Sequence, residues 1–220
     1  MVDRMHDFLL RAQGWRGFVA FSRGILHVII AVLGLLVIAT ALRALGETFN
    51  SDSFPEALAV KVEALPWIFP LHMFTGGLAL LLVPLTLLAR GRSWHKWVGR
   101  LTGLDVLLAG VTAPFVAWVA PVTRVSALGF TMQGLVWMGL FAGGFWFIRQ
   151  GRVAEHRACM LLMMAVTSGA VFFRLYLALW ARFGSHHYLN VFYACDAWVA
   201  WGLPLIGVAL LLLRKPALLA

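Results

Sequence analysis

The sequence predicts an all-α membrane protein, a bundle of six transmembrane helices with the N and C termini in the cytoplasm. Hydrophobic residues make up 62% of the 220 residues and charged residues only 12%, against about 45–50% and 25% in soluble domains. The mean hydropathy is +0.88. Such a chain has too few polar side chains to cover a soluble surface. This excludes a soluble enzyme, a disordered chain and a nucleic-acid-binding module, so the net charge of +9 is interpreted as loop charge.

Six apolar runs are long enough to cross a bilayer, which takes about 20 residues of helix for the ~30 Å hydrocarbon layer. The runs are 24–42, 66–89, 101–120, 125–148, 158–181 and 188–213. They define a membrane domain, 24–213, between an N-terminal segment, 1–23, and a short tail, 214–220. The N-terminal segment is either an amphipathic helix on the membrane surface or an extension of the first span. Pro84, Pro114 and Pro204 fall inside the runs and predict kinks.

Loop charge predicts the orientation. Thirteen Lys and Arg residues fall on one side of the runs and four on the other, where acidic residues accompany them. Cytoplasmic loops carry the excess of Lys and Arg, so both termini are expected in the cytoplasm. We expect a multi-pass membrane protein, in contact with lipid and with no nucleic-acid partner.

Two helical hairpins show the same order of residues. Phe74-Thr75 opens one helix, and a turn at Gly91 then leads to His95-Lys96. Phe130-Thr131 opens another, and a turn at Gly151 leads to His156-Arg157. The similarity indicates either an internal duplication or simply the basic glycine turns that are common in cytoplasmic loops.

Three ionisable residues fall at similar depth toward the outer side: His72, Arg174 and Asp196. Such groups are costly in hydrocarbon and often mark function. We expect Arg174 and Asp196 to pair across the bundle, because an unpaired buried charge is costly, with His72 beside them. The layer is either a substrate site or a structural salt bridge that sets helix register.

Toward the inner side, His27 and Asp105 fall within about one helical turn of the same depth and are expected to form a buried pair. His95 and His156 each begin a helix after a basic turn. Taken singly they are ordinary interfacial residues, but their matched positions favour a shared site. Together with His72 they are the candidate cofactor-binding residues. No metal site is expected.

Small residues predict close helix packing at Gly139 and Gly143, a GxxxG pair, and at Ala165 and Gly169. The two cysteines, Cys159 and Cys195, lie in apolar runs and are expected to fill the core.

Several spaced elements resemble one family. They are His72 before Gly76-Gly77, the run His95-Lys96-Trp97-Val98-Gly99-Arg100, the run His156-Arg157-Ala158-Cys159-Met160, and Arg174. The family comprises predicted bacterial polytopic membrane proteins catalogued as a domain of unknown function, and the resemblance covers about residues 65–213. This chain departs from the family pattern in its last helix, where Gly202-Leu203-Pro204 replace the usual Asn and acidic residue. The resemblance implies a location in the bacterial inner membrane and no particular activity.

Three functions follow from these observations. The first is a redox protein holding haem b through helix-borne histidines. The second is a small-molecule or ion carrier that uses the layer of Arg174, Asp196 and His72. The third is an accessory subunit of a larger membrane complex, without chemistry of its own. No hydrolase or kinase motif is present, and enzymatic activity is left open.

Overall fold

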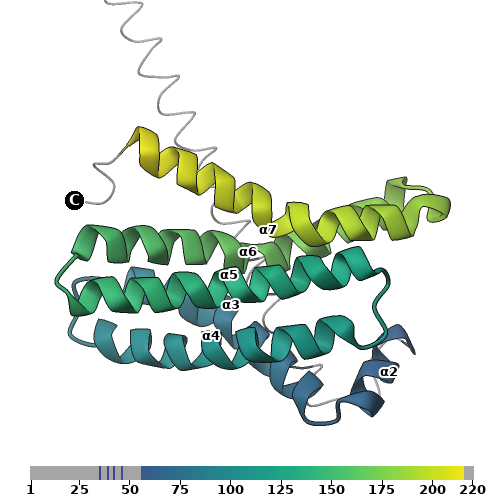
Figure 1. Ribbon diagram of the computed structural model, residues 1–220, viewed down its shortest axis with the longest axis horizontal. Coiled ribbons are helices and arrows are strands. Elements are labelled where there is room, and N and C mark those ends of the chain that lie inside the picture. The colour runs from purple at the N-terminus through teal and green to yellow at the C-terminus, as the bar shows by residue number, and fades with distance from the viewer. Residues whose placement is uncertain (1–34, 36–38, 40–41, 43–45, 47–55, 216–220) are drawn as a thin grey trace, which may run out of the picture. The chain divides into compact units, whose positions relative to one another are not determined.

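The computed structural model describes residues 56–215 together with residues 35, 39, 42 and 46, and over 56–215 every regular element is a helix (Figure 1). The predicted first span, 24–42, lies almost entirely outside the described residues. His27 and the N-terminal segment, 1–23, lie outside them altogether. The predicted all-α class is therefore confirmed for the part of the chain that contains the other five spans.

Five helices are long and apolar enough to cross a membrane. They are α3 (Ile68–Leu88), α4 (His95–Trp118), α5 (Arg124–Arg149), α6 (Val153–Phe183) and α7 (Leu189–Arg214), the last preceded by a 3₁₀ turn, η2 (His186–Tyr188). A short helix, α2 (Glu56–Ala64), precedes them and was not predicted. Its nine residues carry Lys61 and Glu63 and are too few to span a bilayer.

Helix boundaries follow from local chemistry. The helices α4 and α6 begin several residues before the predicted spans, because the basic residues that follow each turn are already helical. Gly91 and Gly151 end the preceding turns with φ of 78° and 74°, a left-handed conformation that costs glycine little. Thr123 caps α5 by accepting the Ser126 N–H at 3.0 Å, and the Thr123 N–H donates back to the Ser126 hydroxyl.

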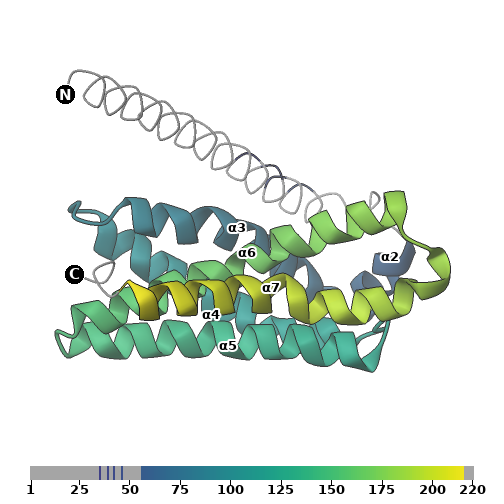
Figure 2. The ribbon, with the colours of Figure 1, turned by 90° about the horizontal axis from the view of Figure 1, so that it is seen from above.

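Consecutive helices run antiparallel. The helices α3, α4, α5 and α6 form a four-helix bundle, because α6 also contacts α3, and α7 packs against α6 and α5 (Figures 1 and 2). The bundle core contains Val83 from α3, Val106 from α4 and Met163 from α6, with Trp137 and Phe141 of α5 packed against them. As predicted, a proline lies inside each of α3, α4 and α7, and α7 bends midway along its length (Figure 1).

Glycines let neighbouring helices approach closely, but not the predicted GxxxG pair. A Cβ on Gly139 would meet nothing within 4 Å, and one on Gly143 would meet only the Cys159 sulfur at 3.7 Å. Gly144, one residue further along α5, is the close contact, because a Cβ there would lie only 3.1 Å from Cys159 Cβ. Gly169 is a second, because a Cβ there would lie 2.6 Å from Trp201 Cβ.

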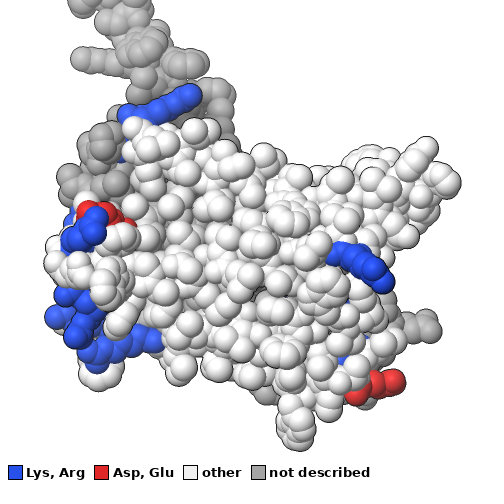
Figure 3. Space-filling view, in the orientation of Figure 1, with Lys and Arg blue, Asp and Glu red and all other residues white. Residues whose placement is uncertain are grey.

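Charge separates toward the two ends of the helices (Figure 3). Among residues 56–215, nine Lys and Arg lie at the end formed by the α3–α4 and α5–α6 turns and the end of α7, and three lie at the opposite end. On the face shown in Figure 3, the surface between these ends is almost entirely uncharged. Exposed Trp67 and Trp118 lie at the arginine-poor end and exposed Trp97 at the basic end, as in an aromatic belt. Cys195 is exposed on α7, so the prediction that it fills the core is wrong.

Candidate functional site

The structure brings His72 and Arg174 to one small crevice between α3 and α6. The crevice has a volume of about 100 Å³, and its wall includes Gly76, Gly77 and Ala170. A Cβ on Gly76 would meet nothing within 4 Å, so the absence of a side chain there leaves open space. This volume equals the share of about three water molecules in the liquid.

His72 is held by α4. Its Nδ1 lies 3.2 Å from the Ala109 carbonyl oxygen and 3.0 Å from the Thr112 hydroxyl. A carbonyl oxygen only accepts hydrogen bonds, so Nδ1 carries the proton in this contact. In the neutral ring, Nε2 then keeps a free lone pair.

Arg174 lies on the α6 side of the same crevice. Its Nη1 donates to the Ala170 carbonyl one turn earlier in α6, at 2.9 Å, and its side chain is exposed. Arg174 and His72 therefore line the same crevice.

Asp196 is not the hydrogen-bonding partner of Arg174. Its side chain on α7 is 2% exposed, and neither carboxylate oxygen has a hydrogen-bond partner among the described residues. The expected hydrogen-bonded pair is absent because Asp196 is buried, whereas the guanidinium is exposed and bonds its own helix.

A line of polar side chains follows the α3–α4 interface from the crevice toward the basic end. Thr112 is bonded to His72, and Asp105 lies seven residues earlier on the same face of α4. Thr102 comes next, and its hydroxyl lies 2.6 Å from that of Thr86. His95 ends the line, because its Nδ1 donates to the Thr86 carbonyl at 3.0 Å. We call these residues the α3–α4 polar line.

His95 and His156 make equivalent bonds in the two hairpins. His95 Nδ1 bonds the Thr86 carbonyl of α3, and His156 Nδ1 bonds the Gly144 carbonyl of α5 at 2.8 Å. Each imidazole thus fastens a helix to the one before it. The bond to Thr86 also occupies a helix-terminal carbonyl, since the Arg90 N–H bonds the Leu87 carbonyl instead.

The helix positions of the two hairpins also correspond. Phe74-Thr75 and Phe130-Thr131 are the seventh and eighth residues of α3 and α5, inside the helices rather than at their openings. Both threonine hydroxyls donate to the carbonyl four residues earlier, at 2.8 Å. The two hairpins therefore carry these residues at matching helix positions.

No metal centre is formed by the residues that the structure describes: no group of three or more His, Cys, Asp or Glu side chains among them could hold a metal ion. His95 and His156 are each bonded within their own hairpin and share no hydrogen bond. The predicted partner of Asp105, His27, lies outside the described residues.

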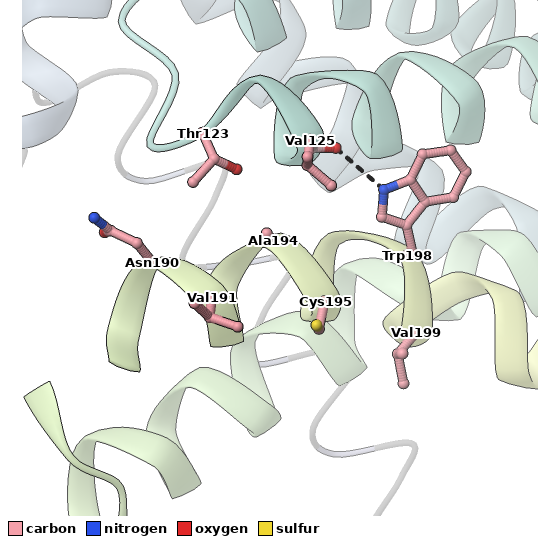
Figure 4. Close-up of a pocket in the computed structure, with 8 residues that line it drawn as sticks. All are labelled: Thr123, Val125, Asn190, Val191, Ala194, Cys195, Trp198 and Val199. Carbon is pink, nitrogen blue, oxygen red and sulfur yellow. Dashed lines mark hydrogen bonds between the residues drawn. The ribbon is translucent and has the colours of Figure 1, made fainter. Parts of the chain in front are cut away.

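A larger hollow, of about 520 Å³, opens between the start of α5 and α7 (Figure 4). Its lining is largely apolar, with Val125, Val191 and Val199 among its residues. Trp198 forms one edge and donates its indole N–H to the Val125 carbonyl at 3.1 Å. None of the predicted site residues lines this hollow.

Sequence reasoning missed the threonines of the polar line. Thr86, Thr102 and Thr112 are buried, and each donates its hydroxyl to the carbonyl four residues earlier. A hydroxyl in an apolar run commonly satisfies itself in this way, so it carries little signal. The useful signal was the spacing of Thr102, Asp105 and Thr112, which places all three on one face of α4.

These features define a class of protein: a polytopic helical membrane protein with ionisable side chains inside its spans. The chain belongs to the family described as "Predicted membrane protein (DUF2306)", whose model matches residues 69–213. That range covers the five described spans, from the second residue of α3 to the last turn of α7. Comparison with curated proteins and with solved structures gave no match.

Proposed function

We propose that this protein is a carrier for a small anion, which binds in the crevice between His72 and Arg174. The observation that carries the proposal is the crevice itself, in which a guanidinium and an imidazole from two candidate spans line the same space. Ionisable groups inside a span commonly line substrate or ion pathways.

The size and chemistry of the crevice limit the substrate class. A volume of about 100 Å³ admits an anion of about three or four heavy atoms, such as formate or nitrate, if each takes the ~30 Å³ share of a water molecule. A guanidinium offers paired donors that match carboxylate and similar planar anions. The imidazole supplies a further donor when its Nε2 is protonated.

Uptake into proteoliposomes tests the proposal, with formate and nitrate as substrates and benzoate as an oversized control. Arg174→Gln and His72→Gln should abolish uptake while the helical content stays unchanged. Arg182→Gln, at the exposed end of the same helix, is the matched control and should transport normally. Wild-type rates in Arg174→Gln would refute the carrier.

Filling the crevice gives an independent test. Gly76→Val places two methyl groups in the open space beside His72 and should block uptake without removing any charge. Gly139→Val makes the same change where the structure also leaves space, and it should transport as the wild type does. Equal uptake by both variants would argue against binding in the crevice.

The proposed location is the bacterial inner membrane, with the basic end of the helices in the cytoplasm. The support is the concentration of Lys and Arg at one end, which the positive-inside rule assigns to the cytoplasm. The C terminus, which follows α7 at this end, would then be cytoplasmic, and six spans would place the N terminus there too. Protease protection of a C-terminal tag in inside-out vesicles would contradict this orientation.

Haem binding is the second candidate. The observation that favours it is the Nδ1 bond made by both His95 and His156, because a histidine ligand usually donates its other ring N–H to a carbonyl or carboxylate. A Soret band in the purified protein, lost in His95→Ala or His156→Ala, would establish it. A featureless spectrum would argue against haem binding. Purification with a stoichiometric partner subunit, together with no transport, would favour an accessory subunit of a larger membrane complex.

A further inference from the structure

The α3–α4 polar line contains one group whose chemistry the anion site does not use. Asp105 lies about 15 Å along α4 from His95, at 1.5 Å per residue, which places it near the middle of a 24-residue helix. Its side chain is 4% exposed, and neither carboxylate oxygen has a hydrogen-bond partner among the described residues.

A carboxylate in this position is costly, because burial in a low-dielectric environment without a donor penalises the charged form. The neutral acid carries no such penalty. A carboxyl group whose two forms differ in this way, with hydroxyl neighbours along one interface, is suited to taking up and releasing a proton.

Asp105 lies between two groups of polar side chains on this interface. Toward the basic end, Thr102 lies three residues away, about 4.5 Å along the helix. Its hydroxyl contacts that of Thr86, whose carbonyl is bonded to His95. Toward the crevice, Thr112 lies seven residues away, about 10 Å along the helix. Its hydroxyl contacts His72.

Few other titratable groups face this interface. The only one on α3 is His72, and α5 has only Arg124 and Arg149, at its two ends. On α4 itself His95, Lys96 and Arg100 all lie at the basic end. Lys61 of α2 bonds the last carbonyls of α4, at the opposite end.

We propose that Asp105 is an intramembrane proton-binding site on the α3–α4 polar line, placed between His72 of the crevice and His95 of the basic end. The Asp105 carboxylate binds one proton to give the neutral acid, and it becomes the anion again when that proton is released. This inference deepens the proposed carrier, and it rests on that carrier for one point only, that proton uptake at Asp105 accompanies transport of the anion.

The proton site is tested without any substrate. The full-length protein in proteoliposomes is followed by infrared difference spectroscopy as the pH is stepped between about 5 and 9, a range that covers the titration of histidine and of carboxyl groups in apolar surroundings. The wild type should show a carboxylic-acid C=O band that titrates and shifts in D₂O. Asp105→Asn should lose this band, and Asp105→Glu should retain one at a shifted frequency.

Asp196→Asn is the matched control, because Asp196 is the other buried carboxylate without a partner in the described range. It should keep the Asp105 band. A band unchanged by Asp105→Asn, or no titrating carboxyl band in the wild type, would overturn the proposal. If Asp105→Asn does not fold, the frequency shift in Asp105→Glu decides the assignment.

Coupling to transport is measured in the same vesicles. Asp105→Asn should reduce anion uptake driven by a pH gradient by roughly tenfold, within the usual range of coupling between sites, and leave anion exchange at equal pH intact. Anion uptake without a titrating band would keep the carrier and remove the proton site. A titrating Asp105 band without anion uptake in the wild type would keep the proton site and remove the carrier.

Discussion

Replacing Gly169 with alanine should loosen the contact between α6 and α7. The added Cβ would lie 2.6 Å from Trp201 Cβ and 3.0 Å from both Trp201 Cα and Gln133 Nε2. Carbon atoms in contact are normally about 3.5–4.0 Å apart, so α7 must retreat by about 1 Å. Trp201 Cα belongs to the backbone and Trp201 Cβ is attached to it. Rotation of the Trp201 side chain therefore cannot move either atom away from the new Cβ.

The size of the effect follows from two opposing contributions. Overpacking of this kind costs about 1–3 kcal/mol, and replacing a helical glycine with alanine returns about 0.5–1 kcal/mol. The net loss lies between about 0 and 2.5 kcal/mol, with a central value of about 1 kcal/mol. At about 2–4 °C per kcal/mol for a chain of this size, the central value corresponds to a fall in melting temperature of about 2–4 °C.

Thermal unfolding in detergent measures this directly, with Gly139→Ala as the control. A Cβ at Gly139 meets nothing within 4 Å, so that variant should be as stable as the wild type or slightly more so. If Gly169→Ala unfolds at the same temperature as Gly139→Ala or higher, the close approach of α6 and α7 is not present in the protein.

Three further results are expected. Gly91→Ala and Gly151→Ala should each cost about 1 kcal/mol in unfolding experiments, because both positions require positive φ. His95→Ala should cost about 1–3 kcal/mol, since it leaves the Thr86 carbonyl without its side-chain donor. Burial lowers the pKa of Lys61, so the folded protein binds fewer protons than the unfolded chain near that pKa. Stability should therefore rise with pH between the folded and unfolded pKa values, as followed by melting temperature.

Each of these three predictions would be contradicted by a specific result. Similar stability of the glycine variants and the wild type would contradict the left-handed turns. His95→Ala with wild-type stability would contradict the bond between α3 and α4. Lys61→Met should remove the increase in stability with pH, and an unchanged pH profile in that variant would show that another group causes it.

Hydropathy was sufficient to predict the five spans that the structure describes, because crossing a bilayer imposes a minimum apolar length that few other structures need. Counting residues along each run also placed His72 and Arg174 at compatible depths, and they line one crevice. Depth alone could not show which way a side chain points. Arg174 and Asp196 were expected to pair on that basis, yet one is exposed and the other is buried.

Helix contacts were harder to predict than the helices. The GxxxG spacing at Gly139 and Gly143 is a real sequence pattern, but the structure uses Gly144, one residue and about 100° around the helix from Gly143. The motif describes which residues permit close packing, and the facing helix decides which of them is used. The short helix α2 was missed for a related reason, since it has little of the long apolar character that identifies a span.

The length of α6 has a consequence for the membrane around it. Its 31 residues extend about 46 Å at 1.5 Å per residue, about 16 Å more than the hydrocarbon layer. Tilt alone would need about 50°, beyond the 0–40° found for such helices, so its ends must enter the headgroup layers. A thinner bilayer increases this mismatch and a thicker one relieves it. Because α6 also carries Arg174, a bilayer of different thickness acts directly on a helix that lines the crevice.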